Sequence, residues 1–151
     1  MLPFFISGEA MKVITKQVSK STKGFNDIID ITDDVEFFIS EQKLSEGQIL
    51  IFINGATAAI STVEYEPGLL QDIPKALERI APMNERYYHN DTWHDGNGYA
   101  HVRSTMMSPM IIMPVYKGRL IRGTWQQVIL LDFDNRPRQR TITLQFTGET
   151  S

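Results

Sequence analysis

The chain has 151 residues, the size of one domain, and a chain of this length can fold without a disulfide or a structural metal. It contains no cysteine, which excludes thiolate metal sites and cysteine nucleophiles and is typical of a reducing compartment, so we expect a cytoplasmic protein. Its net charge of −3, and the lack of any apolar run near the roughly 20 residues of a membrane helix, predict neither a nucleic-acid partner nor a membrane partner.

The first ten residues are apolar and precede a second methionine, Met11, which opens a strand-like run over residues 12–18. We therefore interpret residues 1–10 as an N-terminal extension and residues 11–151 as the domain. A turn is expected over residues 20–24. Thr32 is a candidate N-cap for a helix whose apolar residues recur at helical spacing, and Gly47 is expected to end that segment.

The middle of the chain predicts two strands and two helices. An apolar run over residues 48–53 indicates a buried strand, and a further strand is expected over residues 57–64. Pro67 should open a helix, because the apolar residues between 69 and 80 form one stripe. Residues 83–96 have no clear period, and residues 97–107 form a candidate helix.

The last third of the chain is rich in strand patterns. Residues 125–133 have one mostly apolar face, residues 140–146 alternate between apolar and polar, and residues 135–138 form the turn between them. Because side chains alternate along a strand, Trp125 is expected in the core and Gln126 on the opposite face. Together these elements predict a single α+β domain with a mostly antiparallel sheet and helices on one face.

Two groups of polar residues could carry chemistry. On a helix, Asn97, His101 and Ser104 share one face with Ser108, and that face is either solvated or part of a site. All three histidines lie within 13 residues. His89 and His101 could bind a metal as neutral imidazoles, although their spacing matches no standard zinc signature and both could equally be hydrogen-bonded structural residues.

Charged residues offer further candidates, each with an ordinary alternative. Glu64 and Asp72 flank the start of the second helix, where a carboxylate can ligate a hard cation, act as a base, or simply be solvated. Arg138 and Arg140 have the fork geometry that suits phosphate, but arginines near hairpin turns also serve solubility.

Two runs near the C-terminus resemble the signature of the YjbQ-like family. They are Gly123-Thr124-Trp125-Gln126-Gln127 and the run from Asp132 to Arg140, with its Pro-Arg turn. The resemblance extends from about residue 11 to residue 148. Other residues that fall in the family's order are Thr57, Glu64, Asp72, Tyr88, His89, Asn97, His101, Pro114 and Gly118.

The resemblance implies an α+β fold that assembles as a homotrimer, with a polar site near the subunit contacts. It also implies a weak thiamine-phosphate synthase activity beside a primary reaction that is not settled, a small anionic or phosphorylated ligand, and a divalent metal ion (zinc or magnesium) at His89 and His101. Cations would stabilise the departing pyrophosphate. The expected catalytic residues are His89, His101, Asn97, Glu64 and Asp72, and the expected ligand-binding residues are Thr57, Ser104, Gln126, Arg138 and Arg140.

The chain departs from the family pattern at two positions. Gly55 stands where the family has a histidine after the buried strand, and Val63 replaces an asparagine before Glu64. The loss of a candidate ligand at Gly55 predicts weak metal binding. It also favours an alternative function, a non-catalytic trimer that binds a small anionic ligand.

Overall fold

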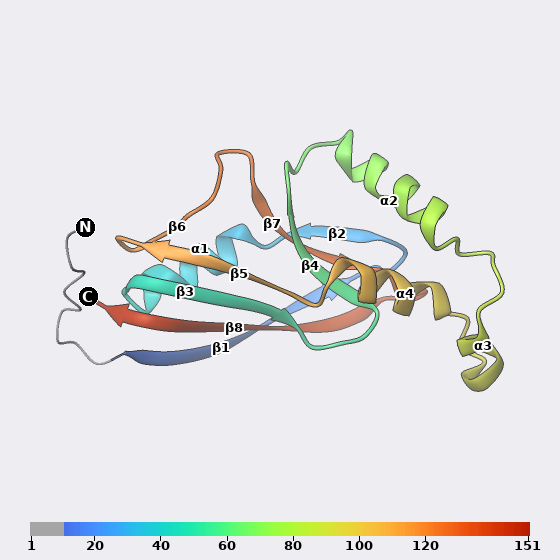
Figure 1. Cartoon of the computed structure of the whole chain (residues 1–151), viewed down its shortest axis with the longest axis horizontal. Coiled ribbons are helices and arrows are strands. Elements are labelled where there is room, and N and C mark those ends of the chain that lie inside the picture. The colour runs from blue at the N-terminus through green and yellow to red at the C-terminus, as the bar shows by residue number, and fades with distance from the viewer. Residues whose placement is uncertain (1–10) are drawn as a thin grey trace, which may run out of the picture.

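The computed structural model describes residues 11–151, so the expected extension over residues 1–10 lies outside the described residues. Eight strands and four helices follow one another along this part of the chain (Figure 1). In chain order they are β1 (Lys12–Thr22), β2 (Asp27–Asp30), α1 (Thr32–Glu41), β3 (Leu44–Ile53), β4 (Ala58–Val63), α2 (Leu69–Ile80), α3 (Tyr88–Trp93), α4 (Gly98–Met107), β5 (Met110–Tyr116), β6 (Arg119–Leu120), β7 (Gln127–Asp132) and β8 (Arg138–Thr150).

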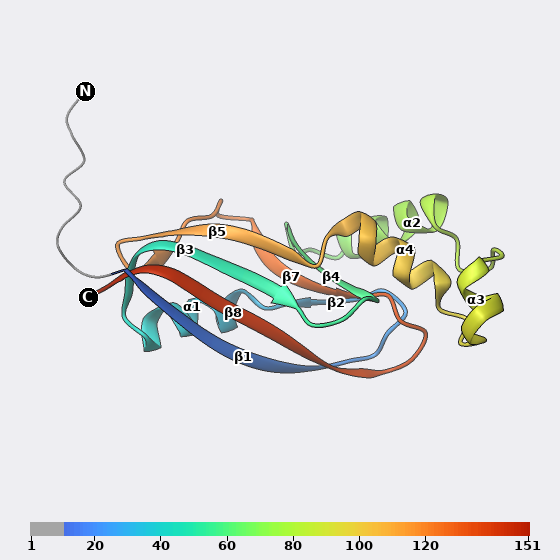
Figure 2. The same cartoon turned by 60° about the horizontal axis from the view of Figure 1, so that its bottom comes forward.

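The strands form two sheets, and every paired strand runs antiparallel to its neighbour. The larger sheet has the order β1-β8-β3-β5-β6, and the smaller one has the order β2-β7-β4 (Figures 1 and 2). The predicted α+β class and the predicted antiparallel pairing are therefore confirmed. The chain passes from the small sheet to the large one between β7 and β8, and this crossing positions the site described below.

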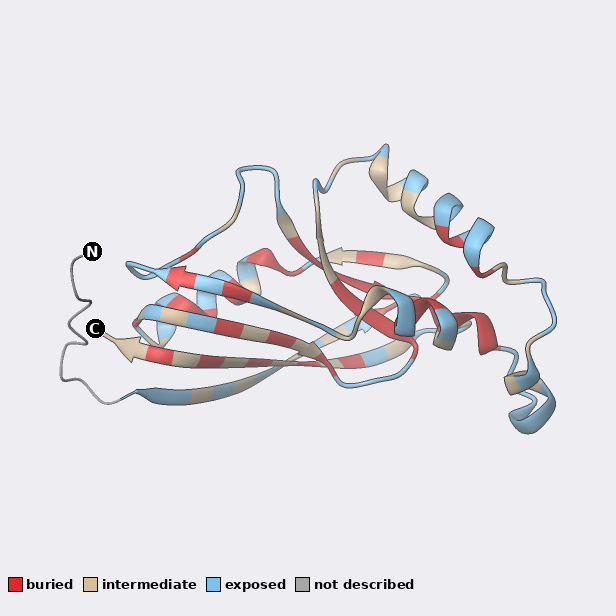
Figure 3. Ribbon diagram, in the orientation of Figure 1, coloured by how far each residue is buried: buried red, intermediate tan, exposed pale blue. Residues whose placement is uncertain are grey.

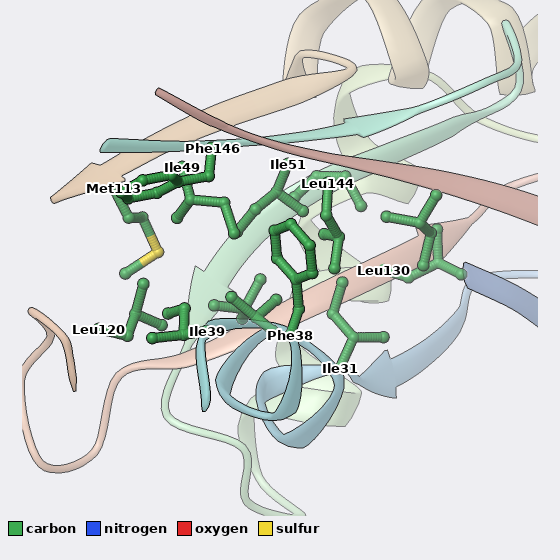
Figure 4. Packing of buried hydrophobic residues seen from close by; sticks show 14 of the residues in the cluster. Ile31, Phe38, Ile39, Ile49, Ile51, Met113, Leu120, Leu130, Leu144 and Phe146 are labelled. Carbon is green, nitrogen blue, oxygen red and sulfur yellow. The ribbon is translucent and has the colours of Figure 1, made fainter. Parts of the chain in front are cut away.

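Strand β7 is buried on both faces. Val128 and Leu130 point into a core that also contains Ile49 and Ile51 of the large sheet and Phe38 of α1 (Figure 4). Complete burial of a side chain of this size contributes about 1.5–3 kcal/mol. This core therefore holds the two sheets and α1 together.

A second core lies on the other face of the small sheet. Ile129 and Leu131, which alternate with the inward pair, pack with Leu77 of α2 and with Tyr99 and Ala100 of α4. The small sheet is thus enclosed between the large sheet on one side and α2 with α4 on the other, and the buried residues concentrate along it (Figure 3). In the part of the chain that the structure describes, no helix is long and apolar enough to cross a bilayer.

Arg103 of α4 is completely buried, and it fixes α2 and the β1–β2 turn to this layer. Its Nε and Nη2 donate to the carbonyl oxygen of Ala81 at 3.0 and 2.7 Å. Nη2 also donates to Glu78 at 2.6 Å, and Nη1 donates to Asn26 Oδ1 at 2.7 Å. A hydrogen-bond acceptor therefore faces each of the three guanidinium nitrogens, as the burial of this charge requires.

Replacement of Arg103 by methionine should lower the free energy of unfolding by about 3–5 kcal/mol, because it leaves the Ala81 carbonyl without its donor and frees α2. Arg86→Met is the control, since the Arg86–Asp91 pair is mostly exposed and should contribute no more than about 1 kcal/mol. Urea unfolding of both variants gives the comparison. Equal losses in the two variants would contradict this role for Arg103.

Two sequence predictions around α1 are wrong. Thr32 is not the N-cap: Ile31 occupies that position, while the Thr32 hydroxyl donates to Asp30 and accepts from the backbone N–H of Val128. Gly47 does not end the helix, which stops at Glu41, but lies inside β3. A Cβ at Gly47 would lie 2.3 Å from the carbonyl oxygen of Thr147, so the glycine permits close approach of β3 and β8.

The predicted core position of Trp125 is also wrong. Its side chain is 69% exposed, because β7 begins only at Gln127. The backbone N–H of Gln126 donates to the carbonyl of Gly123 at 3.0 Å, which closes a turn and interrupts the alternation expected for a strand. Gln126 therefore lies in a turn and not on a strand. Its side chain instead bonds to Gly123 N and Thr62 Oγ1.

Candidate functional site

Two ion pairs join the sheets where β7 leads into β8, and one of them is buried while the arginine of the other is partly exposed. Asp132 ends β7, and both of its carboxylate oxygens accept from Arg140 of β8, from Nε at 2.7 Å and from Nη2 at 2.6 Å. The hydroxyl of Thr22 adds a third donor at 2.5 Å. Asp132 is fully buried and Arg140 nearly so. This two-point contact is the geometry in which a guanidinium compensates a buried carboxylate best.

Asp134 forms the second pair, with Arg138. Arg138 donates through Nε at 2.7 Å, and Thr57 donates to the same carboxylate oxygen at 3.1 Å. Burial alone would raise the pKa of Asp134, but hydrogen bonds from the Asn135 backbone and from the Arg138 and Asn97 side chains hold it below its ordinary value. Asp134 is therefore a fixed negative charge that orients the side chains around it.

The helices α3 and α4 bring His89 and His101 together. Their ring centroids are 4.3 Å apart, and the ring planes are inclined at 50°. Burial and then the nearby His89 lower the pKa of His101, while Asp95, Asp134 and the Ala56 backbone act in the opposite direction. His101 is thus a neutral imidazole at pH 7, able to accept a proton or to bind a metal.

Asn97 lies between the carboxylates of Asp134 and Asp95 and beside His89. In one orientation of its amide, Nδ2 donates to Asp134 Oδ1 at 3.3 Å. In the other orientation, Nδ2 donates to the two carboxylate oxygens of Asp95 at 3.0 and 3.2 Å and to His89 Nε2 at 3.2 Å, and this orientation satisfies the amide better. The Asn97 side chain therefore joins Asp95 and His89 into one polar cluster.

The polar face predicted for α4 is turned inwards, not towards solvent. Asn97 and Ser104 are buried, and His101 is half-buried. Ser104 donates to the carbonyl oxygen of Ala58 at 2.6 Å, so its hydroxyl fastens α4 to β4. Thr57 similarly donates to Asp134 and accepts from Arg140 Nη2 at 2.8 Å. Both hydroxyls are buried and hold neighbouring residues of the site in position.

Three predicted site residues lie at the opposite end of the small sheet. Asp132 pairs with Ala58 at one end of β4, whereas Gln127 pairs with Val63 at the other. Five residues of strand separate these ends, about 17 Å. Glu64 follows Val63 directly, and Gln126 bonds to Thr62 beside it. Within one chain, Glu64, Asp72 and Gln126 are not brought together with the histidines.

Sequence reasoning missed three carboxylates of the site, namely those of Asp95, Asp132 and Asp134. Asp132 and Asp134 continue the alternation of the buried residues of β7, and Arg138 and Arg140 follow with the same spacing of two. Carboxylates on a buried strand face need cationic partners, so this matched spacing was a usable signal. Among residues 11–151, no three His, Asp or Glu side chains form a ready-made metal cluster.

Comparison with known proteins agrees with this architecture. The sequence profile described as "UPF0047 protein YjbQ-like" matches residues 16–149. The chain belongs to the UPF0047 family of YjbQ-like proteins. A UPF0047 protein of Archaeoglobus fulgidus is 35% identical over 119 residues, which cover 79% of this chain and 90% of that protein.

Solved structures of other YjbQ-like proteins share the fold. A YbjQ-like protein of unknown function from Sulfolobus solfataricus has a TM-score of 0.88 and 34% identity, covering 93% of this chain and 100% of that one. A hypothetical protein from Aeropyrum pernix has a TM-score of 0.84 and 29% identity, covering 90% and 99% respectively. The family resemblance read from the signature runs is therefore confirmed.

The lowered pKa of His101 has a measurable consequence in metal-free protein. Its NMR titration midpoint should lie below the ordinary 6.5, and His89→Asn should move it upward because one repulsive neighbour is lost. Since the folded pKa is depressed, stability is lost as pH falls through the unfolded value towards the folded one. Glu64→Gln is the control and should leave the midpoint in place. A wild-type midpoint at or above 6.5 would refute the assignment.

Proposed function

We propose that this UPF0047 protein binds a small phosphorylated molecule with the help of a divalent cation, and that it supports weak transfer of the thiamine-phosphate synthase type. The observation that carries the proposal is the convergence of the Asn97 amide, the Asp95 carboxylate and His89 Nε2 at one edge of the site. A cation beside Asp95 would take the amide oxygen and the carboxylate as ligands, in place of the hydrogen bond between them.

The donor atoms around Asn97 fit a cation. The amide oxygen, the Asp95 carboxylate and His89 Nε2 lie 3.0–3.5 Å from one another. Neighbouring ligands of an octahedral ion with bonds of about 2.1 Å are about 3 Å apart, so these atoms need little rearrangement. Asp95 thus replaces Glu64 as the expected carboxylate ligand. When bound, the ion would neutralise phosphate oxygens of the ligand.

The surroundings of His101 suit the organic part of a small ligand. A hollow of about 250 Å³ is lined by His101, Val102, Thr105 and Met106. Val102 and Met106 are exposed apolar side chains and offer surface to a ring or chain. The neutral His101 can exchange a proton with a group held there, while Asn97 and Asp134 keep the polar end of the site in place.

Gly55 favours the second candidate, binding without turnover. The position that resembles a family histidine carries no side chain here, so the imidazole pair lacks a third member. A turnover assay with a pyrimidine diphosphate and a thiazole phosphate separates the two candidates. Product that requires His101 supports weak transfer, whereas a ligand retained in native mass spectrometry without product supports the non-catalytic alternative.

Isothermal titration with Mn²⁺ tests the cation. The wild type should bind it, and Asp95→Asn should weaken binding at least about tenfold, because the partly exposed carboxylate beside Asn97 loses its charge. Glu64→Gln is the matched control, since Glu64 lies at the far end of β4 and should not change the affinity. Binding should also weaken as the pH falls, because a histidine ligand must be neutral to bind the ion. Equal affinity in Asp95→Asn and wild type would exclude this ion site.

We also propose a homotrimer, as the family resemblance implies. The outer face of the large sheet carries exposed apolar side chains, including Val13 and Ile112, without a covering helix among the described residues. Light scattering should give about three times the 17.3 kDa of one chain, and a charged substitution, Ile112→Asp, should reduce that mass. A wild-type monomer at micromolar concentration would refute the trimer.

A further inference from the structure

We infer that Gly55 and Arg140 form an anion subsite beside the histidines, which takes one terminal phosphate of the ligand; this inference rests on the proposed function. Arg140 is only 7% exposed. Its Nε and Nη2 donate to Asp132, and Nη2 also donates to Thr57. Within residues 11–151, its third nitrogen, Nη1, makes no hydrogen bond. Among residues 11–151, Nη1 is not one of the fully enclosed side-chain atoms that lack a partner, so it is open to an acceptor from solution.

Gly55 gives access to this nitrogen. A Cβ at position 55 would lie 3.0 Å from Arg140 Nη1, so any side chain there would crowd the approach. The φ of Gly55 lies outside the left-handed region, so the backbone does not require glycine at this position. What the glycine provides is open space in front of an unused N–H donor.

The subsite adjoins the rest of the site through the next residue of the loop. The backbone of Ala56 lies close enough to His101 to raise its pKa, and Thr57 bonds to both Arg140 and Asp134. An oxyanion at Nη1 would therefore lie beside the imidazole pair, across the loop from the proposed cation. This arrangement fits a ligand with two anionic groups, such as a diphosphate, rather than a neutral molecule.

Charge balance defines what the subsite recognises. Asp132 already compensates Arg140 at two points, and Asp134 lies 3.8 Å from Nη2. Because these carboxylates offset most of its charge, Arg140 would attract an anion mainly through a directed hydrogen bond from Nη1. The subsite should therefore prefer a phosphate oxygen with several lone pairs over a monovalent anion such as chloride.

The side chain at position 55 should therefore affect the binding of phosphate and the binding of the cation differently. A methyl group at this position blocks the oxyanion and leaves the cation site alone. An imidazole also blocks the oxyanion, but it adds a nitrogen donor next to His101. Gly55→His should accordingly weaken phosphate binding and strengthen Mn²⁺ binding, and opposite changes of this kind would not follow from a general loss of structure.

The experiment measures inorganic phosphate and pyrophosphate binding by isothermal titration in metal-free protein. The wild type should bind pyrophosphate, and Gly55→Ala should weaken binding at least about tenfold through loss of a charged hydrogen bond. Gly123→Ala is the matched control, because its Cβ would make only ordinary contact with Gln126 at 3.6 Å. Acetate and chloride serve as arms for other anions, and unfolding midpoints verify that both variants are folded.

The outcomes separate this subsite from the proposed function. Loss of pyrophosphate binding in Gly55→Ala with Mn²⁺ binding retained supports the subsite. Equal pyrophosphate affinity in Gly55→Ala and wild type, or no wild-type affinity, overturns it, and the proposed function survives if Mn²⁺ still binds. Absence of Mn²⁺ binding overturns the proposed function instead. Wild-type crystals soaked in tungstate give a second reading: density beside Arg140 Nη1 supports the subsite, and its absence there contradicts it.

Discussion

The structure depends on the double ion pair that joins its two sheets at the start of β8. Asp132 with Arg140 and Asp134 with Arg138 bring two buried carboxylates, one nearly buried guanidinium and one partly exposed guanidinium together where the chain leaves the small sheet. Burial of these charges costs free energy that good geometry only partly offsets, so the pairs are weak evidence of stability. The main effect of the pairs is to fix positions. Because removal of any one member would leave an unpaired charge, the ends of β4, β7 and β8 are held in one arrangement.

The site is built outward from this junction. Asp134 accepts from Asn97 at the start of α4, and Thr57 connects Asp134 to Arg140. Asn97 also contacts Asp95 and His89, so a single amide links the ion pairs to residues at the exposed edge of the site. The ion pairs thus hold the cluster of Asn97, Asp95 and His89 on one side and leave an unused N–H of Arg140 on the other. A cation and an oxyanion are the groups that would bind at these two places.

Periodicity predicted much of the site but not which ends of the strands meet. The helical spacing of Asn97, His101 and Ser104 was sufficient to place them on one face, because a short amphipathic helix fixes its own geometry. Glu64 was expected at the site because it is a carboxylate that falls in the family's order. The alternation of residues along a strand does not reveal the direction of the strand or its pairing register. In the structure, β4 runs away from the site, and Glu64 follows its far end.

Local turns account for the other differences between sequence and structure. Trp125 fits the alternation of β7, yet the turn at Gly123 places it before the first ladder pair. Asp132 and Asp134 were not recognised as site residues, although their spacing of two matches that of Arg138 and Arg140. His89 was found from the clustering of the three histidines and from the family resemblance, since no period marks α3.

The most direct test of this account is an anomalous difference map from crystals grown with Mn²⁺. The account predicts one peak that contacts the Asn97 side-chain oxygen and the Asp95 carboxylate, with His89 Nε2 as a further ligand. Absence of a peak at saturating Mn²⁺, with the Asn97 amide nitrogen turned towards Asp95, would contradict it.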